Sequence, residues 1–261
     1  MSTLLEIRGL TKRFGGVTAL DGVSMTVGEG ETVGLIGPNG AGKTTLFNCM
    51  TGVLRPEQGE IRFGRDGPVS LAGLAPYQIV ECGVARTFQN IRLFSSMSVL
   101  ENALVGTYTR THTGLLSAAL HRPDARREEQ WARDRAMTLL EFVGLAALAH
   151  ESAGALPFGL QRRLEIARAL ASDPVLLLLD EPAAGLNPVE KQQLAQLVQQ
   201  MRAQGLTMLI IEHDMAFVMP IASRIAVLDY GKKIAEGSPA AIQSDPLVIE
   251  AYLGTPNSPV R

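Results

Sequence analysis

A nine-residue segment, GPNGAGKTT at residues 37–45, has the most specific chemistry in this chain. It fits the pattern G-x-x-x-x-G-K-[ST], with Gly37, Gly42, Lys43 and Thr44 at the fixed positions. Glycine lets the backbone take positive φ angles and approach a ligand closely, so that N–H groups converge on an anion. The Lys43 charge suits nucleotide β- and γ-phosphates, and the Thr44 hydroxyl suits Mg²⁺. The segment therefore predicts a site for ATP or a similar triphosphate, with magnesium.

The surroundings of this segment strengthen the prediction. An apolar run, TVGLI, precedes it, and a helix is expected to begin near Gly42. With this composition the pattern arises by chance in fewer than about one chain in a hundred. We assign Asn39 and Gly40 to the same phosphate-binding loop, and Thr45 is placed to help with the α-phosphate.

A second motif, VLLLLDEP, is a continuous apolar run that ends in two acids. Such a run is typical of a fully buried parallel strand. Asp180 at its end is where a nucleotide-hydrolysing enzyme of this type holds Mg²⁺, usually through water. Glu181 follows at once and is the candidate to orient or deprotonate the attacking water.

The remaining motifs resemble those of the nucleotide-binding subunit of an ABC transporter. Gln89 in RTFQN resembles the Q-loop glutamine, which implies a catalytic and a metal-binding role. His213 in IIEHD resembles the switch histidine that contacts the γ-phosphate, and AAGLNP at 183–188 resembles the D-loop. Phe14 lies where the family stacks an aromatic ring on adenine. In this order and over almost the whole length, the combination is highly specific.

The signature motif departs from the LSGGQ of the family. It reads LPFGL here, with Leu156 and Gly159 retained and Pro157, Phe158 and Leu160 as replacements. The loss of the serine removes a hydroxyl that, in the family, reaches the γ-phosphate of the partner subunit. Proline suits the first position of a helix. We therefore expect the start of a helix here to bind the partner's nucleotide.

In that arrangement the N–H groups of Phe158, Gly159 and Leu160 are expected to point out of the helix start. Anion binding then depends on the backbone and the helix dipole. Gln161 is a candidate to replace the missing side-chain donor.

A longer resemblance narrows the family. The segments ARTFQNIRLFSSMSVLENALVG, RRLEIARAL, DEPAAGLNP, LIIEHDM and VIEAYLG are together similar to the larger ATP-binding subunit of branched-chain amino acid importers. The related subunit of urea or short-amide importers is the alternative. Nothing in the chemistry of these residues selects one cargo over the other.

The elements that must position these motifs alternate between strands and helices. This alternation predicts an α/β fold, a P-loop NTPase (RecA-like) core with a mainly parallel sheet. An antiparallel β edge is expected from a hairpin around Tyr230, and GLNPVEKQQLAQLVQQM predicts a helix capped by Asn187. We divide the chain into residues 1–90 and 156–261, which form the ATP-binding core, and an inserted helical subdomain at 91–155.

The helical subdomain is expected because residues 121–145 read as helix. Their charges nearly balance, so a solvated face is the expected reading. The buried side is expected to comprise Trp131, Leu139, Leu140 and Val143. Nearer its start, Phe94, Met97 and Leu100 have two alternative readings, a docking groove for a membrane permease or core packing.

Composition excludes several classes of protein. The 261 residues are 46% hydrophobic with a net charge of −2, which gives no reason to expect nucleic acid as a partner. Two cysteines, Cys49 and Cys82, are too few for a disulfide framework and are expected to be buried and reduced. No segment reads as a signal peptide or reaches the length of a membrane span. The resemblance implies a place at the cytoplasmic face of the plasma membrane, where another chain must hold this one.

The resemblance implies which chains these are. They are integral membrane permease subunits, a second ATP-binding subunit that is identical or paralogous, and indirectly a periplasmic or extracellular substrate-binding protein. A GTPase is disfavoured because no N-K-x-D guanine motif is present. A small-molecule kinase and a non-transport ABC-type ATPase fit the motifs and the length less well. A catalytically inactive binding module is disfavoured by Lys43, Asp180, Glu181 and His213.

Overall fold

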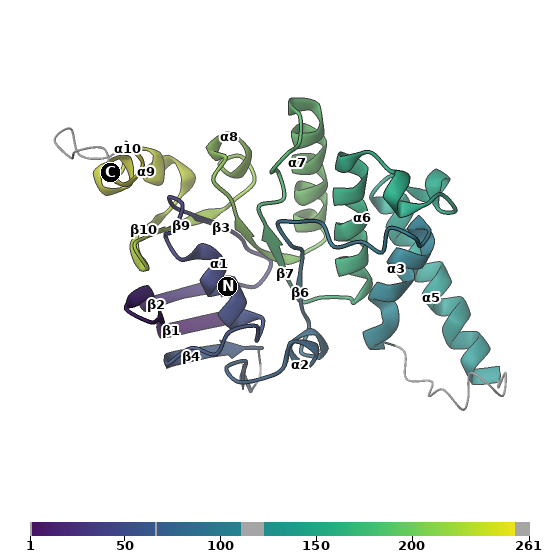
Figure 1. The fold of residues 1–261 in the computed structure, drawn as a ribbon, viewed down its shortest axis with the longest axis horizontal. Coiled ribbons are helices and arrows are strands. Elements are labelled where there is room, and N and C mark those ends of the chain that lie inside the picture. The colour runs from purple at the N-terminus through teal and green to yellow at the C-terminus, as the bar shows by residue number, and fades with distance from the viewer. Residues whose placement is uncertain (1, 66, 111–122, 254–261) are drawn as a thin grey trace.

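The computed structural model describes residues 2–65, 67–110 and 123–253. It contains two β-sheets, with helices packed between them and around the larger one (Figure 1). Within the described residues, no helix combines the length and apolar character needed to cross a bilayer.

The larger sheet has six strands and holds the motifs. In spatial order they are β10 (Lys232–Gly237), β9 (Arg224–Asp229), β3 (Thr32–Ile36), β8 (Thr207–Ile211), β7 (Leu176–Asp180) and β6 (Val84–Arg86). All neighbouring pairs are parallel except β10 with β9. Every residue of β3, β7 and β8 is buried, which explains why these strands read as unbroken apolar runs. The expected parallel sheet with an antiparallel edge is confirmed.

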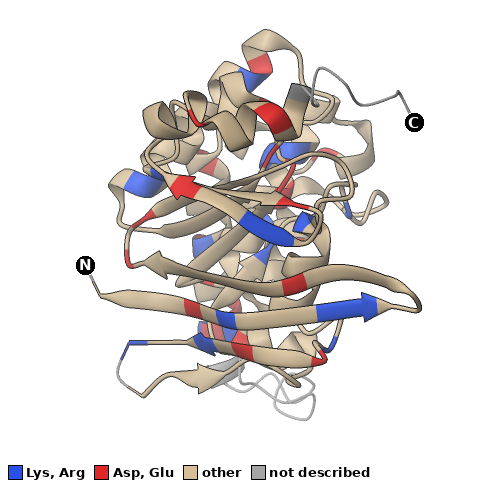
Figure 2. Cartoon of the chain, turned by 90° about the vertical axis from the view of Figure 1, so that its left-hand side faces the viewer, with Lys and Arg blue, Asp and Glu red and all other residues tan. Residues whose placement is uncertain are grey.

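The smaller sheet is antiparallel. Its order is β2 (Val17–Gly28), β1 (Thr3–Phe14), β4 (Gln58–Phe63) and β5 (Val69–Ser70). One face is apolar because buried Leu20, Val23, Met25 and Val27 alternate with more exposed residues along β2. Figure 2 shows basic and acidic residues interspersed along the strands of this layer.

One helix fills the space between the two sheets. This is α1 (Lys43–Met50), whose Leu46, Phe47 and Met50 pack with the apolar faces of both sheets in one core. Two short connections beside it are α2 (Pro76–Glu81) and the residues leading into β6. Cys49 is buried here and Cys82 is half-buried; both are free thiols.

A group of helices lies on the other side of the larger sheet (Figure 1). They are α3 (Val99–Thr107), α5 (Pro123–Phe142), α6 (Phe158–Ala171), α7 (Pro188–Ala203) and the short α8 (Met215–Val218), with 3₁₀ turns at Tyr108–Arg110, Ala146–Leu148 and Ala153–Ala155. The helices α3 and α5 pack mainly against each other and against α6. Leu177 of β7 and Met208 of β8 join these helices in a second core. The expected cap of α7 is confirmed, since the Asn187 side chain accepts a hydrogen bond from the Glu190 amide.

Packing in the helical region differs from the sequence prediction at one residue. Leu139, Leu140 and Val143 are buried as expected, but Trp131 is 44% exposed. The buried stripe of α5 instead runs through Ala132 and Ala136, because small residues let this helix approach α3 closely. Leu100 in the first turn of α3 lies in the core, whereas Phe94 and Met97, which precede this helix, keep 49% and 37% of their surface exposed.

The chain ends, within its described part, in a third small core. The hairpin of β9 and β10 turns at Tyr230, as predicted, and is followed by α9 (Pro239–Gln243) and α10 (Pro246–Leu253). Val248 and Ile242 of these helices pack with Ile36, the last residue of β3. The C-terminal helices therefore support the strand that leads into the phosphate-binding loop.

Parallel pairing brings four motifs to one edge of the larger sheet. The loop at 37–42 follows β3, Gln89 follows β6, Asp180 ends β7 and His213 follows β8. In parallel sheets, ligands bind beyond the carboxyl ends of the strands. The carboxyl edge of this sheet is therefore the expected place for the site.

Candidate active site

Two glycines of the phosphate-binding loop lie against backbone of neighbouring strands. At Gly37, with φ of 150°, an added Cβ would lie 2.0 Å from the Leu228 carbonyl oxygen of β9. At Gly42, with φ of 101°, it would lie 2.4 Å from the Ala19 carbonyl oxygen of β2. Neither position has room for a side chain, so both the backbone angle and the close approach require glycine.

Lys43 begins α1, and its buried side chain folds back over the loop. Its Nζ donates hydrogen bonds to the carbonyl oxygens of Gly37, at 2.6 Å, and Pro38, at 2.9 Å. Burial lowers the pKa of the Lys43 ammonium, and the negative charges of Glu181 and Asp180 partly offset this effect. The ammonium is thus held at the loop by carbonyls that a phosphate group can replace.

A cavity of about 180 Å³ opens over this loop. It is lined by Ala19, residues 39–45 and Glu181, so Asn39, Gly40, Thr44 and Thr45 all face it. This volume is smaller than the roughly 300 Å³ at which pockets for whole ligands begin. It suits the phosphate groups of a nucleotide, with the base and sugar outside.

Phe14 does not line this cavity. It lies at the end of β1 with its ring 47% exposed, and the Lys12 Nζ is 5.3 Å from the ring centroid. The exposed ring is available for stacking, and its contact with adenine stays a prediction.

Asp180 is buried at the carboxyl end of β7, and one of its two carboxylate oxygens accepts a hydrogen bond from a side chain. Its Oδ2 accepts a hydrogen bond from Arg86 Nη2 at 2.8 Å. Its Oδ1 is buried without a hydrogen-bond partner among the described residues. A buried carboxylate oxygen without a hydrogen-bond partner is suited to bind a magnesium ion or a water of its hydration shell.

A cation here would need ligands besides carboxylates. The part of the chain that the structure describes contains no cluster of three or more His, Cys, Asp or Glu residues suited to a metal. Phosphate oxygens together with Thr44, Gln89 and Asp180 match the sparse protein ligation that is usual for Mg²⁺.

Glu181 is the point on which two distant motifs converge. Its Oε2 lies 3.0 Å from Gln89 Nε2, which donates a hydrogen bond to it, and 3.5 Å from His213 Nδ1. The Glu181 backbone has φ of 45°, a left-handed conformation, and its amide donates to the Ile211 carbonyl. Two of the residues expected to be catalytic from the sequence, Gln89 and His213, therefore both lie beside the carboxylate of the third, Glu181, which lines the phosphate cavity.

A fully buried acid, Glu212, supports two of these segments and was missed by the sequence analysis. Its Oε1 accepts from the Ala183 amide at 2.8 Å, and its Oε2 from the amides of His213 and Asp214 at 3.1 and 3.3 Å. Burial raises the pKa of Glu212, and these amides oppose the rise. The signal available in the sequence was an acid directly after the apolar run TMLII.

A buried ion pair on α6 holds the segment around Gln89. Arg162 Nη1 donates to Glu165 Oε2 and to the Phe88 carbonyl, both at 2.7 Å, and Nη2 donates to the Gln89 carbonyl at 2.8 Å. Glu165 Oε1 accepts from the amides of Phe88 and Arg92 at 3.2 and 3.4 Å. The sequence signal was two opposite charges three residues apart in an otherwise apolar helix face.

The signature region lies outside the cavity. Pro157 caps α6, which begins at Phe158 and includes Gly159. The expectation of a free Leu160 amide is wrong, because it donates to the Pro157 carbonyl at 2.9 Å. Gln161 Nε2 donates to the Leu156 carbonyl at 2.9 Å.

The Phe158 ring fills the space beside a glycine of the D-loop. A Cβ on Gly185 would lie 3.0 Å from this ring, which is 46% exposed. The residue that replaces the usual glycine of the signature motif therefore contacts the D-loop within the same chain.

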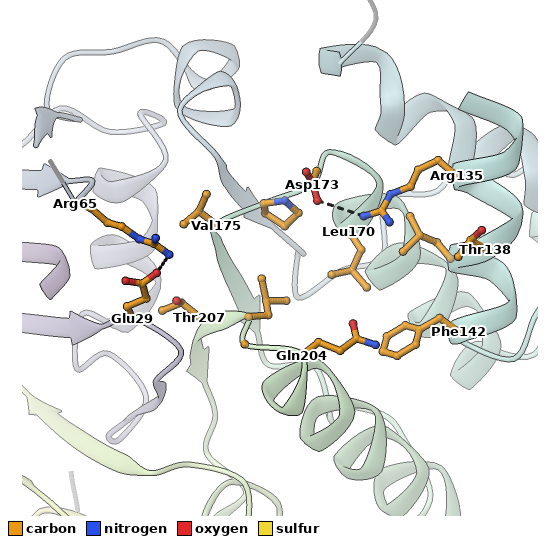
Figure 3. Close-up of a pocket in the computed structure, with 14 residues that line it drawn as sticks. Glu29, Arg65, Arg135, Thr138, Phe142, Leu170, Asp173, Val175, Gln204 and Thr207 are labelled. Carbon is orange, nitrogen blue, oxygen red and sulfur yellow. Dashed lines mark hydrogen bonds and ion pairs between the residues drawn. The ribbon is translucent and has the colours of Figure 1, made fainter. Parts of the chain in front are cut away.

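A larger pocket, of about 460 Å³, lies away from these residues (Figure 3). It is near the amino ends of β7 and β8 and contains two ion pairs, Arg65 with Glu29 and Arg135 with Asp173. Each lining arginine is thus already paired with an acid. None of the residues expected to bind nucleotide lines this pocket, so we place the active site at the smaller cavity.

Comparison with known proteins identifies the family of the chain. The family model described as ABC transporter matches residues 20–184, which include the phosphate-binding loop, Gln89, Asp180 and Glu181. The chain belongs to the ABC transporter family. A second model, described as branched-chain amino acid ATP-binding cassette transporter, matches residues 232–256 of this ABC cassette.

Curated relatives and solved structures extend over nearly the whole cassette. BraF of Pseudomonas aeruginosa, a high-affinity branched-chain amino acid transport ATP-binding protein, is 48% identical over 96% of this chain and 98% of its own length. LivG of Escherichia coli, which carries the same description, is 49% identical with the same coverage. A crystal structure of the ADP conformation of an ATP-binding cassette from an ABC transporter matches with a TM-score of 0.84, at 34% identity over 98% of this chain and 100% of that one.

The family fixes the activity of this ABC cassette. ABC cassettes bind nucleotide and hydrolyse ATP in transport, and this chain is an ATPase of that kind.

Proposed function

We propose that this cassette powers an importer of branched-chain amino acids by binding and hydrolysing ATP. The names of BraF and LivG and the match at residues 232–256 support this cargo. The observation that carries the catalytic part is the convergence of Gln89 and His213 on Glu181, beside the cavity at Lys43.

Binding of ATP is assigned to the loop and the start of α1. Gly37, Asn39, Gly40 and Gly42 shape a loop whose amides face the phosphates, and α1 adds the positive end of its dipole. Lys43 exchanges its two carbonyl partners for phosphate oxygens, and Thr45 donates its hydroxyl to the α-phosphate. Phe14 stacks on adenine outside the cavity.

Magnesium is assigned to Thr44, Gln89 and Asp180. When bound, Mg²⁺ neutralises phosphate charge as the bond to the γ-phosphate breaks. Asp180 contributes its unpartnered Oδ1, held in place through Oδ2. Gln89 must first leave the Glu181 carboxylate, which frees that acid at the same time.

Hydrolysis is assigned to Glu181 as general base. Its carboxylate borders the cavity, so it can take a proton from a water aligned with the γ-phosphate. His213, whose side chain is more exposed, lies beside the same carboxylate oxygen and is placed to contact the γ-phosphate and orient the water.

A second ATP-binding subunit completes the site. Pro157, Phe158 and Gly159 do not line the cavity of their own chain. We assign them to the nucleotide of the partner cassette, where the free amides at the start of α6 face the phosphates. ATP then lies between two cassettes, and closure excludes water.

Attachment to the membrane is assigned to integral permease subunits on its cytoplasmic side. The segment 91–155 between the two core segments, 1–90 and 156–261, is the proposed lever. Its exposed Phe94 and Met97 are candidates for the permease contact, while Leu100 packs in the core. A periplasmic or extracellular binding protein would deliver the cargo to the permease.

Reconstitution with candidate permease subunits and a substrate-binding protein tests the proposal. In proteoliposomes, ATP inside should drive uptake of leucine, isoleucine or valine. Uptake of urea or short amides instead would reject the proposed cargo and favour the alternative importer.

The variant Glu181→Gln tests whether Glu181 acts as the general base in ATP hydrolysis. It keeps the shape of the side chain but removes the base, so ATP turnover should fall by about 10²–10⁴ while ATP binding remains. The variant should also accumulate as an ATP-bound dimer in size-exclusion chromatography with light scattering. Glu151→Gln, an exposed acid outside the cavity, is the control, and parental turnover by Glu181→Gln would reject Glu181 as the base.

A further inference from the structure

Arg86 is a buried arginine beside the proposed magnesium site. It ends β6, three residues before Gln89, and 7% of its side chain is exposed. The guanidinium carbon lies over the rings of Phe47 and Phe88, at 5.5 and 5.2 Å from their centroids. Both ring contacts and its burial favour this position of the guanidinium, because a cation is attracted to each ring face.

Its hydrogen bonds join three elements of the fold. Nη2 donates to Asp180 Oδ2 at 2.8 Å on β7. Nη1 donates to Asn48 Oδ1 at 2.8 Å on α1 and to the Thr51 hydroxyl at 3.1 Å just beyond it. With its own place on β6, one side chain thus connects α1, β6 and β7.

Each of these elements carries one of the proposed magnesium donors. Thr44 is in the first turn of α1, Gln89 follows β6 and Asp180 ends β7. Octahedral Mg²⁺ tolerates little error in the placement of its oxygen ligands, so the relative position of the three elements matters. Arg86 is the group that contacts all three.

The hydrogen bond from Arg86 also sets the orientation of the Asp180 carboxylate. Because Oδ2 is bonded to the guanidinium, the carboxylate cannot rotate freely, and Oδ1 remains without a partner among the described residues. An arginine offers several donors in a fixed plane, which lets it hold a carboxylate and an amide oxygen together. A lysine supplies charge but no such plane.

We propose that Arg86 is a positioning residue for magnesium. It holds Asp180 with Oδ1 toward the nucleotide and keeps α1, β6 and β7 in fixed positions relative to one another. The inference rests on the proposed role of Asp180 as a magnesium donor. It predicts that Arg86 affects the magnesium-dependent part of ATP binding and leaves the magnesium-independent part unchanged.

The test compares ATP affinity with and without magnesium by calorimetry of the full chain. For Arg86→Met, affinity in EDTA should stay within about twofold of the parent, while the gain on adding Mg²⁺ should shrink by about tenfold or more, or about 1.4 kcal/mol. Arg86→Lys should restore little of that gain. Arg92→Met is the control, because Arg92 stacks on the same Phe88 ring at 4.5 Å and is exposed.

Asp180→Asn separates this inference from the function on which it rests. If Asp180→Asn keeps the full magnesium gain, Asp180 is not a donor and the proposed metal site is wrong. If it loses the gain while Arg86→Met keeps it, only the role of Arg86 is rejected. Tighter magnesium binding in Arg86→Met would also reject that role, since Arg86 would then merely compete for Asp180.

A milder variant covers the case in which Arg86→Met fails to fold. Asn48→Ala removes one anchor of the guanidinium and leaves Arg86 and Asp180 paired. It should lose part of the magnesium gain, by about two- to fivefold, with unchanged affinity in EDTA. An unchanged gain in this variant would overturn the positioning role.

Discussion

Replacing Arg162 with methionine tests whether the buried ion pair on α6 holds the segment that carries Gln89. The change removes the three hydrogen bonds that this guanidinium donates to Glu165 and to the carbonyls of Phe88 and Gln89. Methionine fills much of the same volume, so lost charge and hydrogen bonding are the main effects. Arg162 and Glu165 are 0% and 1% exposed, so water cannot replace the lost partner.

The expected cost is about 3 kcal/mol. Breaking a buried ion pair by removing one partner costs about 3–5 kcal/mol, because it leaves an uncompensated buried charge. Glu165 keeps the two amides of Phe88 and Arg92, which places the estimate at the lower end. Against a total stability of about 5–15 kcal/mol, the loss is large but leaves a folded protein to study.

Urea denaturation followed by circular dichroism measures this cost. Adding Glu165→Gln to Arg162→Met should recover at least about 1 kcal/mol, because it removes the orphaned charge. Arg163→Met, next along the helix and only half-buried, should cost less than about 1 kcal/mol. Hydrogen exchange should show faster opening at the amides of Phe88 and Arg92 in Arg162→Met.

The pH dependence supplies an independent check. Burial raises the pKa of Glu165, and the charge of Arg162 opposes the rise, so the pKa should rise further in Arg162→Met. The folded state then binds a proton more tightly than the unfolded state, and stability falls as pH rises through that window. The cost should therefore be smaller at about pH 5 than at about pH 8. A cost below about 1 kcal/mol, or one that shrinks with rising pH, would refute this reasoning.

Three further predictions concern the site. Lys43→Ala should weaken MgATP binding by about 1.5–3 kcal/mol in calorimetry, because a charge-assisted contact to phosphate is lost; unchanged affinity would reject the phosphate-binding assignment. Stacking on Phe14 with few base-edge contacts should give a preference for ATP over GTP below about a thousandfold in competition binding. A stronger preference would require a hydrogen-bonding base pocket. Glu212→Gln should destabilise the fold by about 1–3 kcal/mol in urea, because an amide cannot accept the three N–H groups that this carboxylate accepts. A neutral effect would contradict that network.

The sequence by itself determined the phosphate-binding loop and its setting. Gly37, Gly42 and Lys43 follow one another at a spacing that only a strand, a tight loop and a helix start satisfy, so local geometry decides the structure. The cap at Asn187 and the turn at Tyr230 are local in the same sense. The buried strand that ends in Asp180 is visible because a strand covered on both faces must be apolar at every position.

Which side chains of a helix are buried, and which of its first amides are free, depends on how the helix is rotated and packed against its neighbours. Trp131 reads as a core residue because it is large and apolar, yet α5 buries the alanines of the neighbouring face. The signature region shows the same limit: a helix start was expected, but whether the Leu160 amide is free depends on where the first turn closes. Packing against neighbours sets both, and no local pattern encodes it.

Only the tertiary structure decided which residues support the site. Arg86 contacts an aspartate 94 positions away, and Arg162 contacts the Phe88 carbonyl 74 positions away. Gln89, Glu181 and His213 could be named from their motifs, but their meeting at one carboxylate oxygen requires the parallel order of β6, β7 and β8. The physical reason is that buried charges must find partners wherever the fold brings them, and such pairing leaves no periodic trace along the chain.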